Sequence, residues 1–204
     1  MEFNQLGWNL LTLGLFGTFT TTLSLVWGLR YQSRNIIENK SGQSVSTVQF
    51  LYGVCSSMAA VVYGLGILKA ALIINGSIMF VARFPVLRGL IRYKGLSVAE
   101  KATGTFLVMA LAAMMVLPEK EGFYVMFQLG GIIFTVAQPW EIAKNRSSGV
   151  VEYRLLVVAC VHSFFWLVYG YAIHNRVIII TSICGLMTNI VTILLWLKYR
   201  SSEK

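Results

Sequence analysis

Hydrophobic residues in this chain occur in long runs, and each run ends in a short polar or charged gap. A helix needs about 20 apolar residues to cross the hydrocarbon core of a bilayer. Seven runs are near this length: 8–30, 46–68, 70–91, 100–117, 122–142, 151–173 and 177–197. Pro118 closes the fourth run, whereas only Lys69 separates the second from the third. The pattern predicts an all-α membrane protein with seven transmembrane helices.

The composition agrees with this interpretation. Of the 204 residues, 56% are hydrophobic and only 12% are charged, against about 25% charged residues in an ordinary soluble domain. The net charge of +9 would suit a nucleic-acid partner, but the basic residues lie in the short gaps between the apolar runs. Membrane orientation explains that placement better. We therefore expect the lipid bilayer as a partner and no nucleic acid.

The positions of Lys and Arg also predict the orientation of the chain. If the N-terminus lies outside, only Lys69, Lys120 and Arg176 fall in outer gaps, and Arg83 lies within the third span. All other Lys and Arg then face the cytoplasm, as the positive-inside rule requires. We expect a multi-pass protein of the plasma membrane or a bacterial inner membrane, with the C-terminus in the cytoplasm. The first run is too long for a signal-peptide core, so we expect it to be retained.

An internal repeat relates two parts of the chain. Residues 32–74 align with residues 138–180 at an offset of 106 without a gap, and polar and glycine positions are among the identities. Each copy has a helix ending in Gln, a basic loop with the sequence Asn-Lys-Ser or Asn-Arg-Ser, a second helix ending in Val-Tyr-Gly, and a third helix. Chance similarity between apolar segments would not gather on such positions.

The repeat predicts how the seven helices are organised. Three helices, one linker helix and three more helices form a 3+1+3 parallel repeat of triple-helix bundles. The boundaries are 1–95 for the first bundle, 96–120 for the linker helix and 121–204 for the second bundle. Transporters with this symmetry hold their substrate near the membrane midplane, between the two halves.

The repeated residues resemble the PQ-loop superfamily and, within it, the SWEET and half-size SemiSWEET sugar transporters. The family signature is a Pro-Gln pair with a Ser nine residues after the Gln, and Gln32 and Gln138 have Ser41 and Ser147 at that spacing. In this chain the Pro before each Gln is replaced, and Pro139 follows its Gln instead. The first span has no Pro at all, so the hinges that relatives use for alternating access would have to differ.

The resemblance implies a facilitative transporter that moves a small neutral solute, a mono- or disaccharide, by alternating access. The family motif Trp-x-x-Tyr-Gly matches the second copy at Trp166, and Ala60 takes the Trp position in the first copy. In similar proteins these positions line the pocket, and an Asn on the third helix of each half binds the substrate. Asn75 matches that Asn, with Thr181 and Ser182 at the corresponding position of the second half. Relatives often form trimers, which implies a homo-oligomer.

Helical spacing adds candidates from the residues alone. His162, Trp166 and Tyr169 share one face of the sixth span, and the equivalent face of the second span carries Ser56, Ala60 and Tyr63. An indole opposite a small residue suits the C–H face of a sugar. The predicted substrate-binding residues are Trp166, Asn75, Ala60, Thr181, Ser182, His162 and Ser56. The predicted gating residues are Tyr63, Tyr169, Gln32, Gln138 and Pro139, with each Gln ending the first helix of its half.

Three features leave alternatives open. His162 is either a neutral, hydrogen-bonded side chain or a route for proton coupling, and Trp166 either lines the pocket or packs against lipid or protein. Arg83 either snorkels to the cytoplasmic interface or faces the cavity, where it would favour a small organic anion or an amino acid. Finally, the missing first-span prolines favour a non-transporting membrane receptor or scaffold with the same fold.

Other chemistry is not indicated. The sequence shows no nucleophile and base, no phosphate loop and no metal cluster, and its three cysteines lie in apolar runs without metal or redox spacing. We expect no enzymatic activity and no cofactor. The chain contains no Asp, and Glu141 lies at the cytoplasmic end of the fifth span. It therefore matches proton-coupled relatives poorly, and diffusion down a gradient is the simpler mechanism.

Overall fold

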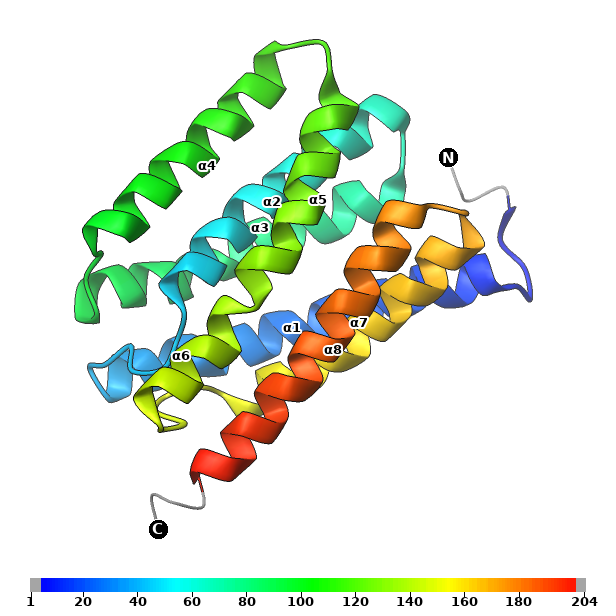
Figure 1. Ribbon diagram of the computed structural model, residues 1–204. Coiled ribbons are helices and arrows are strands. Elements are labelled where there is room, and N and C mark those ends of the chain that lie inside the picture. Colours follow the sequence, from blue (N-terminus) through cyan, green and yellow to red (C-terminus); the bar gives the residue numbers. More distant parts are fainter. Residues whose placement is uncertain (1–4, 201–204) are drawn as a thin grey trace.

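The computed structural model describes residues 5–200, and within this range it contains eight helices and no strand (Figure 1). The helices are α1 (Leu10–Glu38), α2 (Thr47–Ile67), α3 (Ala70–Tyr93), α4 (Val98–Val116), α5 (Lys120–Thr135), α6 (Ala137–Asn145), α7 (Tyr153–Ala172) and α8 (Arg176–Arg200). The predicted boundaries at residues 1–4 and 201–204 lie outside the described residues. The expectation of an all-helical chain is confirmed.

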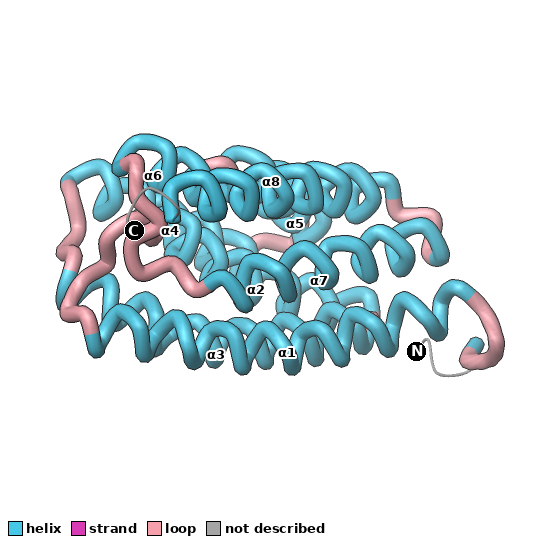
Figure 2. Tube along the Cα trace, turned by 90° about the horizontal axis from the view of Figure 1, so that it is seen from below, coloured by secondary structure: helices cyan, strands magenta, loops and turns pink. Residues whose placement is uncertain are grey.

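The helices lie side by side in one bundle. α3 packs against α1 and α2, and α8 packs against α7, α5 and α6. Contacts of α1 with α7 and of α2 with α5 join these two groups, and α4 lies at the edge against α2 and α5. Figure 2 shows α1 and α3 along one side of the bundle and α8 along the opposite side. The start of α1 and the end of α8 lie at opposite ends of the bundle.

Six helices are long and apolar enough to cross a membrane: α1, α2, α3, α4, α7 and α8. The fifth predicted span is instead divided into α5 and α6, and Pro139 explains the division. Proline has no N–H, and its ring clashes with the carbonyl four residues earlier, which here belongs to Thr135, the last residue of α5. Val136 keeps a helical conformation, with φ −65° and ψ −20°, so α6 follows α5 along one path in Figure 1.

The prediction that each Gln ends its helix is wrong. α1 continues past Gln32 to Glu38, and α6 continues past Gln138 to Asn145. A helix satisfies its backbone internally and needs no apolar side chains to continue past a polar residue. The chain then turns at Lys40 and Arg146, which lie 106 residues apart and have φ values of 45° and 48°.

Close contact between α1 and α7 depends on glycines of α1. A Cβ atom on Gly14 would lie 2.7 Å from the Cα of Tyr169, and one on Gly17 would lie 2.0 Å from the ring of Phe165. Real Cβ atoms do not approach neighbours this closely, so each position requires glycine. The two helices thereby bring the polar face of α1 against the helix that carries His162 and Trp166.

Candidate functional site: a central cavity

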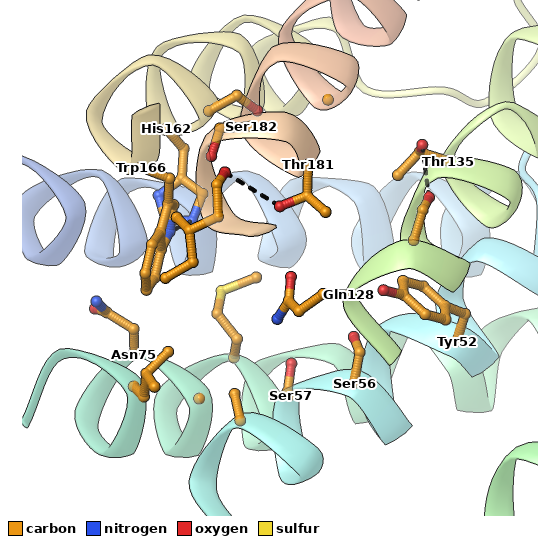
Figure 3. Close-up of a pocket in the computed structure, with 18 of the residues that line it drawn as sticks. Tyr52, Ser56, Ser57, Asn75, Gln128, Thr135, His162, Trp166, Thr181 and Ser182 are labelled. Carbon is orange, nitrogen blue, oxygen red and sulfur yellow. Dashed lines mark hydrogen bonds between the residues drawn. The ribbon is translucent and has the colours of Figure 1, made fainter. Parts of the chain in front are cut away.

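A cavity of about 250 Å³ lies between α2, α3, α5, α7 and α8 (Figure 3). All seven predicted substrate-binding residues line it: Ser56, Ala60, Asn75, His162, Trp166, Thr181 and Ser182. In Figure 3, His162 and Trp166 from α7 lie across the cavity from Ser56 and Ser57 of α2. Helical spacing predicted Ser56, Ala60, His162 and Trp166 on cavity-facing sides of α2 and α7, and these residues do line the cavity. Trp166 lines the pocket, which decides against its packing only on lipid or protein.

Hydrogen bonds hold His162 as a neutral imidazole. Trp166 Nε1 donates to His162 Nε2 at 2.8 Å, and His162 Nδ1 lies 2.8 Å from the hydroxyl of Thr21, which donates to the carbonyl of Gly17 at 2.7 Å. An indole N–H only donates, so Nε2 has no proton and Nδ1 carries it. In an imidazolium, Nε2 would also carry a proton, and its N–H would face the N–H of Trp166. The geometry favours the neutral alternative for His162.

Asn75 lines the cavity and holds an unpaired, sealed acceptor. Its side chain is only 4% exposed. Nδ2 donates weakly to the Thr18 hydroxyl at 3.4 Å, and Oδ1 has no hydrogen-bond partner. A buried polar atom without a partner lowers stability. Oδ1 is sealed in this conformation, so a solute hydroxyl could pair with it only after the Asn75 amide turns toward the cavity.

Arg83 turns inward rather than snorkelling to the interface. It lines the cavity, and its Nη1 donates to the carbonyl of Gly53 and to the hydroxyl of Ser57, both on α2. The guanidinium fits there because Gly53 has no side chain: a Cβ at that position would lie 3.0 Å from Arg83 Cζ. Among the described residues, no acidic side chain pairs with Arg83.

Sequence reasoning missed the face of α5 that completes the cavity. Tyr124, Gln128, Gly131 and Thr135 all line it. Their spacing is that of one helical face, the same signal that identified the face of α7.

Aromatic contacts close the bundle near the ends of α2 and α7, where the gating tyrosines lie. Tyr63 of α2 stacks on Tyr124 of α5, with ring centroids 4.2 Å apart and an interplanar angle of 11°. Tyr169 of α7 is fully buried and packs with Leu11 and Leu15 of α1. Each tyrosine therefore lies at one of the two junctions that join the helix groups.

A second cavity of about 200 Å³ adjoins the first, shares Arg83 and His162 with it, and reaches Gln32 and Gln138. These glutamines make matching bonds across the bundle. Gln32 Nε2 donates to the carbonyl of Val150 at 3.0 Å, and Gln32 Oε1 accepts from the N–H of Glu152 at 2.8 Å. The Gln32 amide therefore binds the backbone of the loop that precedes α7.

Gln138 repeats the same pair of bonds in the other direction. Its Nε2 donates to the carbonyl of Ser44 at 2.7 Å, and its Oε1 accepts from the N–H of Ser46 at 3.0 Å. Ser44 and Ser46 lie 106 residues before the partners of Gln32. We call these two sets of bonds the glutamine clamps. Each holds the loop of one helix group against the other group.

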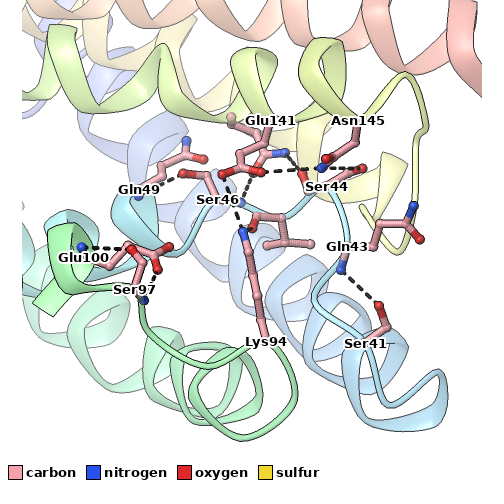
Figure 4. A network of polar contacts seen from close by, with 12 residues as sticks. Ser41, Gln43, Ser44, Ser46, Gln49, Lys94, Ser97, Glu100, Glu141 and Asn145 are labelled. Carbon is pink, nitrogen blue, oxygen red and sulfur yellow. Dashed lines mark hydrogen bonds and ion pairs between the residues drawn. The ribbon is translucent and has the colours of Figure 1, made fainter.

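Charged groups reinforce the Gln138 clamp (Figure 4). Lys94 at the end of α3 donates to the carbonyl of Val45 at 2.7 Å and lies 3.5 Å from a carboxylate oxygen of Glu141 on α6. Asn145 approaches the Ser44 hydroxyl at 3.4 Å. This end of the bundle is therefore closed by polar contacts, whereas the tyrosine end is closed by aromatic ones.

The chain resembles known proteins both in part of its sequence and in its fold. Residues 123–204 match a family model described as "Sugar efflux transporter for intercellular exchange". The fold resembles that of a eukaryotic SWEET transporter solved at 3.7 Å resolution, with a TM-score of 0.60 and 15% identity over 93% of this chain and 99% of that one. No curated protein sequence gives a significant match. The predicted SWEET-like resemblance is confirmed, and the matched family consists of transporters and not of enzymes.

Proposed function

From this likeness to sugar efflux transporters, we propose that the chain is a facilitative membrane transporter of a small polyhydroxylated solute, a mono- or disaccharide. The central cavity carries the proposal, because it combines the indole of Trp166 with the amides of Asn75 and Gln128 and the hydroxyls of Ser56 and Thr181. Indole faces stack on sugar C–H groups, and amides and hydroxyls pair with sugar hydroxyls. A volume of about 250 Å³ is below that of pockets for drug-sized ligands and favours a monosaccharide.

We further infer a 3+1+3 repeat with α4 as the linker helix, at the boundaries predicted above. Support comes from features that recur at an offset of 106: the glutamine clamps, and the left-handed residues Leu68 and His174, with φ values of 54° and 53°. The N-terminus outside, the cytoplasmic C-terminus, the plasma or bacterial inner membrane and a trimeric assembly remain proposals from the sequence.

Alternating access would open the two closed ends in turn. Release of Tyr63 from Tyr124 would open the aromatic end, and release of the glutamine clamps would open the polar end. The break at Pro139 gives the second helix group a place to bend, since Pro139 has no N–H to donate to the carbonyl of Thr135. These roles for Tyr63, Tyr169, Gln32, Gln138 and Pro139 are part of the proposal.

Counterflow of labelled sugars in proteoliposomes tests the proposal. We expect saturable uptake, a reduction of about tenfold or more in Trp166→Ala and Asn75→Ala, and no change in Trp140→Ala, whose side chain is 67% exposed on α6. Flux that is equal in all four proteins would contradict the assignment of the cavity. Saturable binding of a sugar without any flux would favour the receptor or scaffold.

A further inference from the structure

The two helix groups differ at one position of their shared pattern. Arg83 of α3 donates to Ser57 of α2, and Asn189 of α8 donates to Ser163 of α7 at 3.2 Å. Both pairs are related by the offset of 106. The same framework therefore holds a positive charge in one group and a neutral amide in the other.

Part of the Arg83 guanidinium remains available. Both of its hydrogen bonds use Nη1. Nε and Nη2 have no hydrogen-bond partner among the described residues, yet neither is among the sealed, unpaired side-chain atoms. Both therefore keep some accessible surface, and Arg83 lines both cavities. Together Nε and Nη2 form one edge of the guanidinium fork, which binds the two oxygens of a carboxylate or phosphate.

The charge at Arg83 has no partner of opposite sign in the protein as described. Charged side chains inside a membrane protein are costly, and they usually pair or mark the path of a substrate or ion. The ion pairs of the described residues lie elsewhere: Arg34 with Glu38, Lys94 with Glu141, and Arg154 with Glu152. A structural link between α2 and α3 needs only the Nη1 bonds, and Asn189 shows that a neutral amide can make the equivalent bond to serine.

We propose that the solute of the central cavity is an anionic sugar, with its acid group on the Nε–Nη2 edge of Arg83. Its hydroxyls would pair with Asn75 and Gln128, and its C–H face would lie on Trp166. The inference rests on the proposed transport function and narrows its substrate class. A hydroxylated solute with one negative charge supplies the counter-charge that Arg83 lacks, and its uniport carries charge across the membrane.

The test compares solutes that differ in one group: glucose, glucuronate and glucose 6-phosphate, in proteoliposomes with a potassium-valinomycin potential. A transported monoanion should accumulate about tenfold for a potential of about 60 mV, inside positive. We expect glucuronate to respond in this way, or glucose 6-phosphate, which carries between one and two negative charges at pH 7, to accumulate more steeply. Glucose uptake should be indifferent to the potential. Whichever acid is taken up identifies carboxylate or phosphate as the group that Arg83 binds. This readout needs no variant, so it holds even if changes at Arg83 impair folding.

Variants then assign the effect to Arg83. Arg83→Gln should weaken anion affinity about 10- to 100-fold and leave glucose within about threefold, because hydrogen bonds to a charged group are the stronger ones. Arg83→Lys keeps the positive charge and should weaken anion affinity less than Arg83→Gln does. Arg88→Gln is the matched control, since this exposed arginine lies on the same helix.

Each contrary outcome has a separate meaning. Transport of glucose with rejection of both anions would overturn the inference and leave the proposed function standing. An equal loss for glucose and anions in Arg83→Gln would reduce Arg83 to a link between α2 and α3, and would also overturn it. Absence of flux and binding for every solute would overturn the proposed function itself.

Discussion

The two helix groups are alike at the closed polar end and unlike in the cavity. At the polar end, Gln32 and Gln138 each donate to one loop carbonyl and accept from one loop N–H of the opposite group, with all four distances between 2.7 and 3.0 Å. In the cavity, Arg83 stands where the other group has Asn189. The two helix groups therefore contribute equivalent bonds at the polar end, whereas the side chains that they place at the cavities differ.

This difference has a physical basis. Both groups must move as matched halves if the ends open in turn, so the bonds that close them benefit from being equivalent. A sugar, the proposed solute, has no two-fold symmetry. A cavity with two identical halves would therefore present unsuitable partners to one side of the sugar. Trp166 against Ala60 and Arg83 against Asn189 show the same division. The predictions below test which differences between the groups matter.

The largest expected effect comes from exchanging the helix break. Ser33 of α1 corresponds to Pro139 by the offset of 106, yet α1 is continuous there. Ser33→Pro would remove an N–H and clash with the carbonyl of Leu29, at about 3 kcal/mol or more. Pro139→Ser restores the missing N–H and should keep or raise thermal stability while slowing counterflow. Similar stability losses in both variants would contradict the hinge role of Pro139.

The glutamine clamps come next. Gln138→Leu or Gln32→Leu leaves one loop N–H and one carbonyl unpaired, and each such group costs about 1–3 kcal/mol when buried. Because the clamps join the two helix groups at the polar end, we expect this end to open more often. Spin labels at Glu38 and Lys144, which are exposed near this end, would then report a longer distance. Gln43→Leu, an exposed glutamine of the same loop, should leave the distance unchanged.

Equivalence of the two clamps can be checked directly. Each single variant should shift the ratio of open to closed molecules at the polar end by a similar factor, which is about 30-fold if the lost bonds contribute about 2 kcal/mol. The double variant should show coupling, because neighbouring bonds that close one face are not independent. A large shift in only one variant would show that closure, like recognition, is asymmetric.

A smaller effect on stability is expected where the Arg83–Ser57 pair differs from the Asn189–Ser163 pair. Gly53 corresponds to Ala159, and only Gly53 faces a guanidinium. An Ala for Gly change inside a helix normally gains about 1 kcal/mol, but Gly53→Ala should lose stability because its Cβ displaces Arg83. In the Arg83→Asn background the same change should become stabilising. Thermal unfolding of the wild type, the two single variants and the double variant completes a double-mutant cycle. If Gly53→Ala changes stability with the same sign in both backgrounds, the proposed contact between position 53 and Arg83 is contradicted.

The sequence predicted the residues that depend on helical spacing and missed those that depend on contacts between helices. Ser56, Ala60, His162 and Trp166 face the cavity because they share one face of α2 or α7, which the 3.6-residue period determines. The inward turn of Arg83 depends on Gly53, a residue of another helix thirty positions earlier. No local pattern in α3 contains that information.

The helix boundaries at the glutamines show the same limit. The repeat predicted a helix end at each Gln, because a polar residue there is followed by a basic loop. The helices continue because their backbones are satisfied internally, and each amide instead binds a loop of the other helix group, more than 90 residues away. The position of Pro139 was visible in the sequence, but the break four residues earlier follows from its clash with Thr135 and belongs to backbone geometry.

The smallest predicted effect concerns Trp166 and His162, which the first group replaces with Ala60 and Ser56. Trp166→Phe removes the indole donor and should cost about 1 kcal/mol, measured by thermal unfolding. It also frees His162 Nε2 to accept a proton. Wild-type flux should therefore be flat between about pH 5 and pH 8, the range in which an unconstrained histidine titrates, whereas the variant should vary with pH. Trp140→Phe, at an exposed position, should behave as wild type. A pH dependence already present in the wild type and unaltered by Trp166→Phe would show that His162 is not held neutral, and would reopen proton coupling through the second helix group alone.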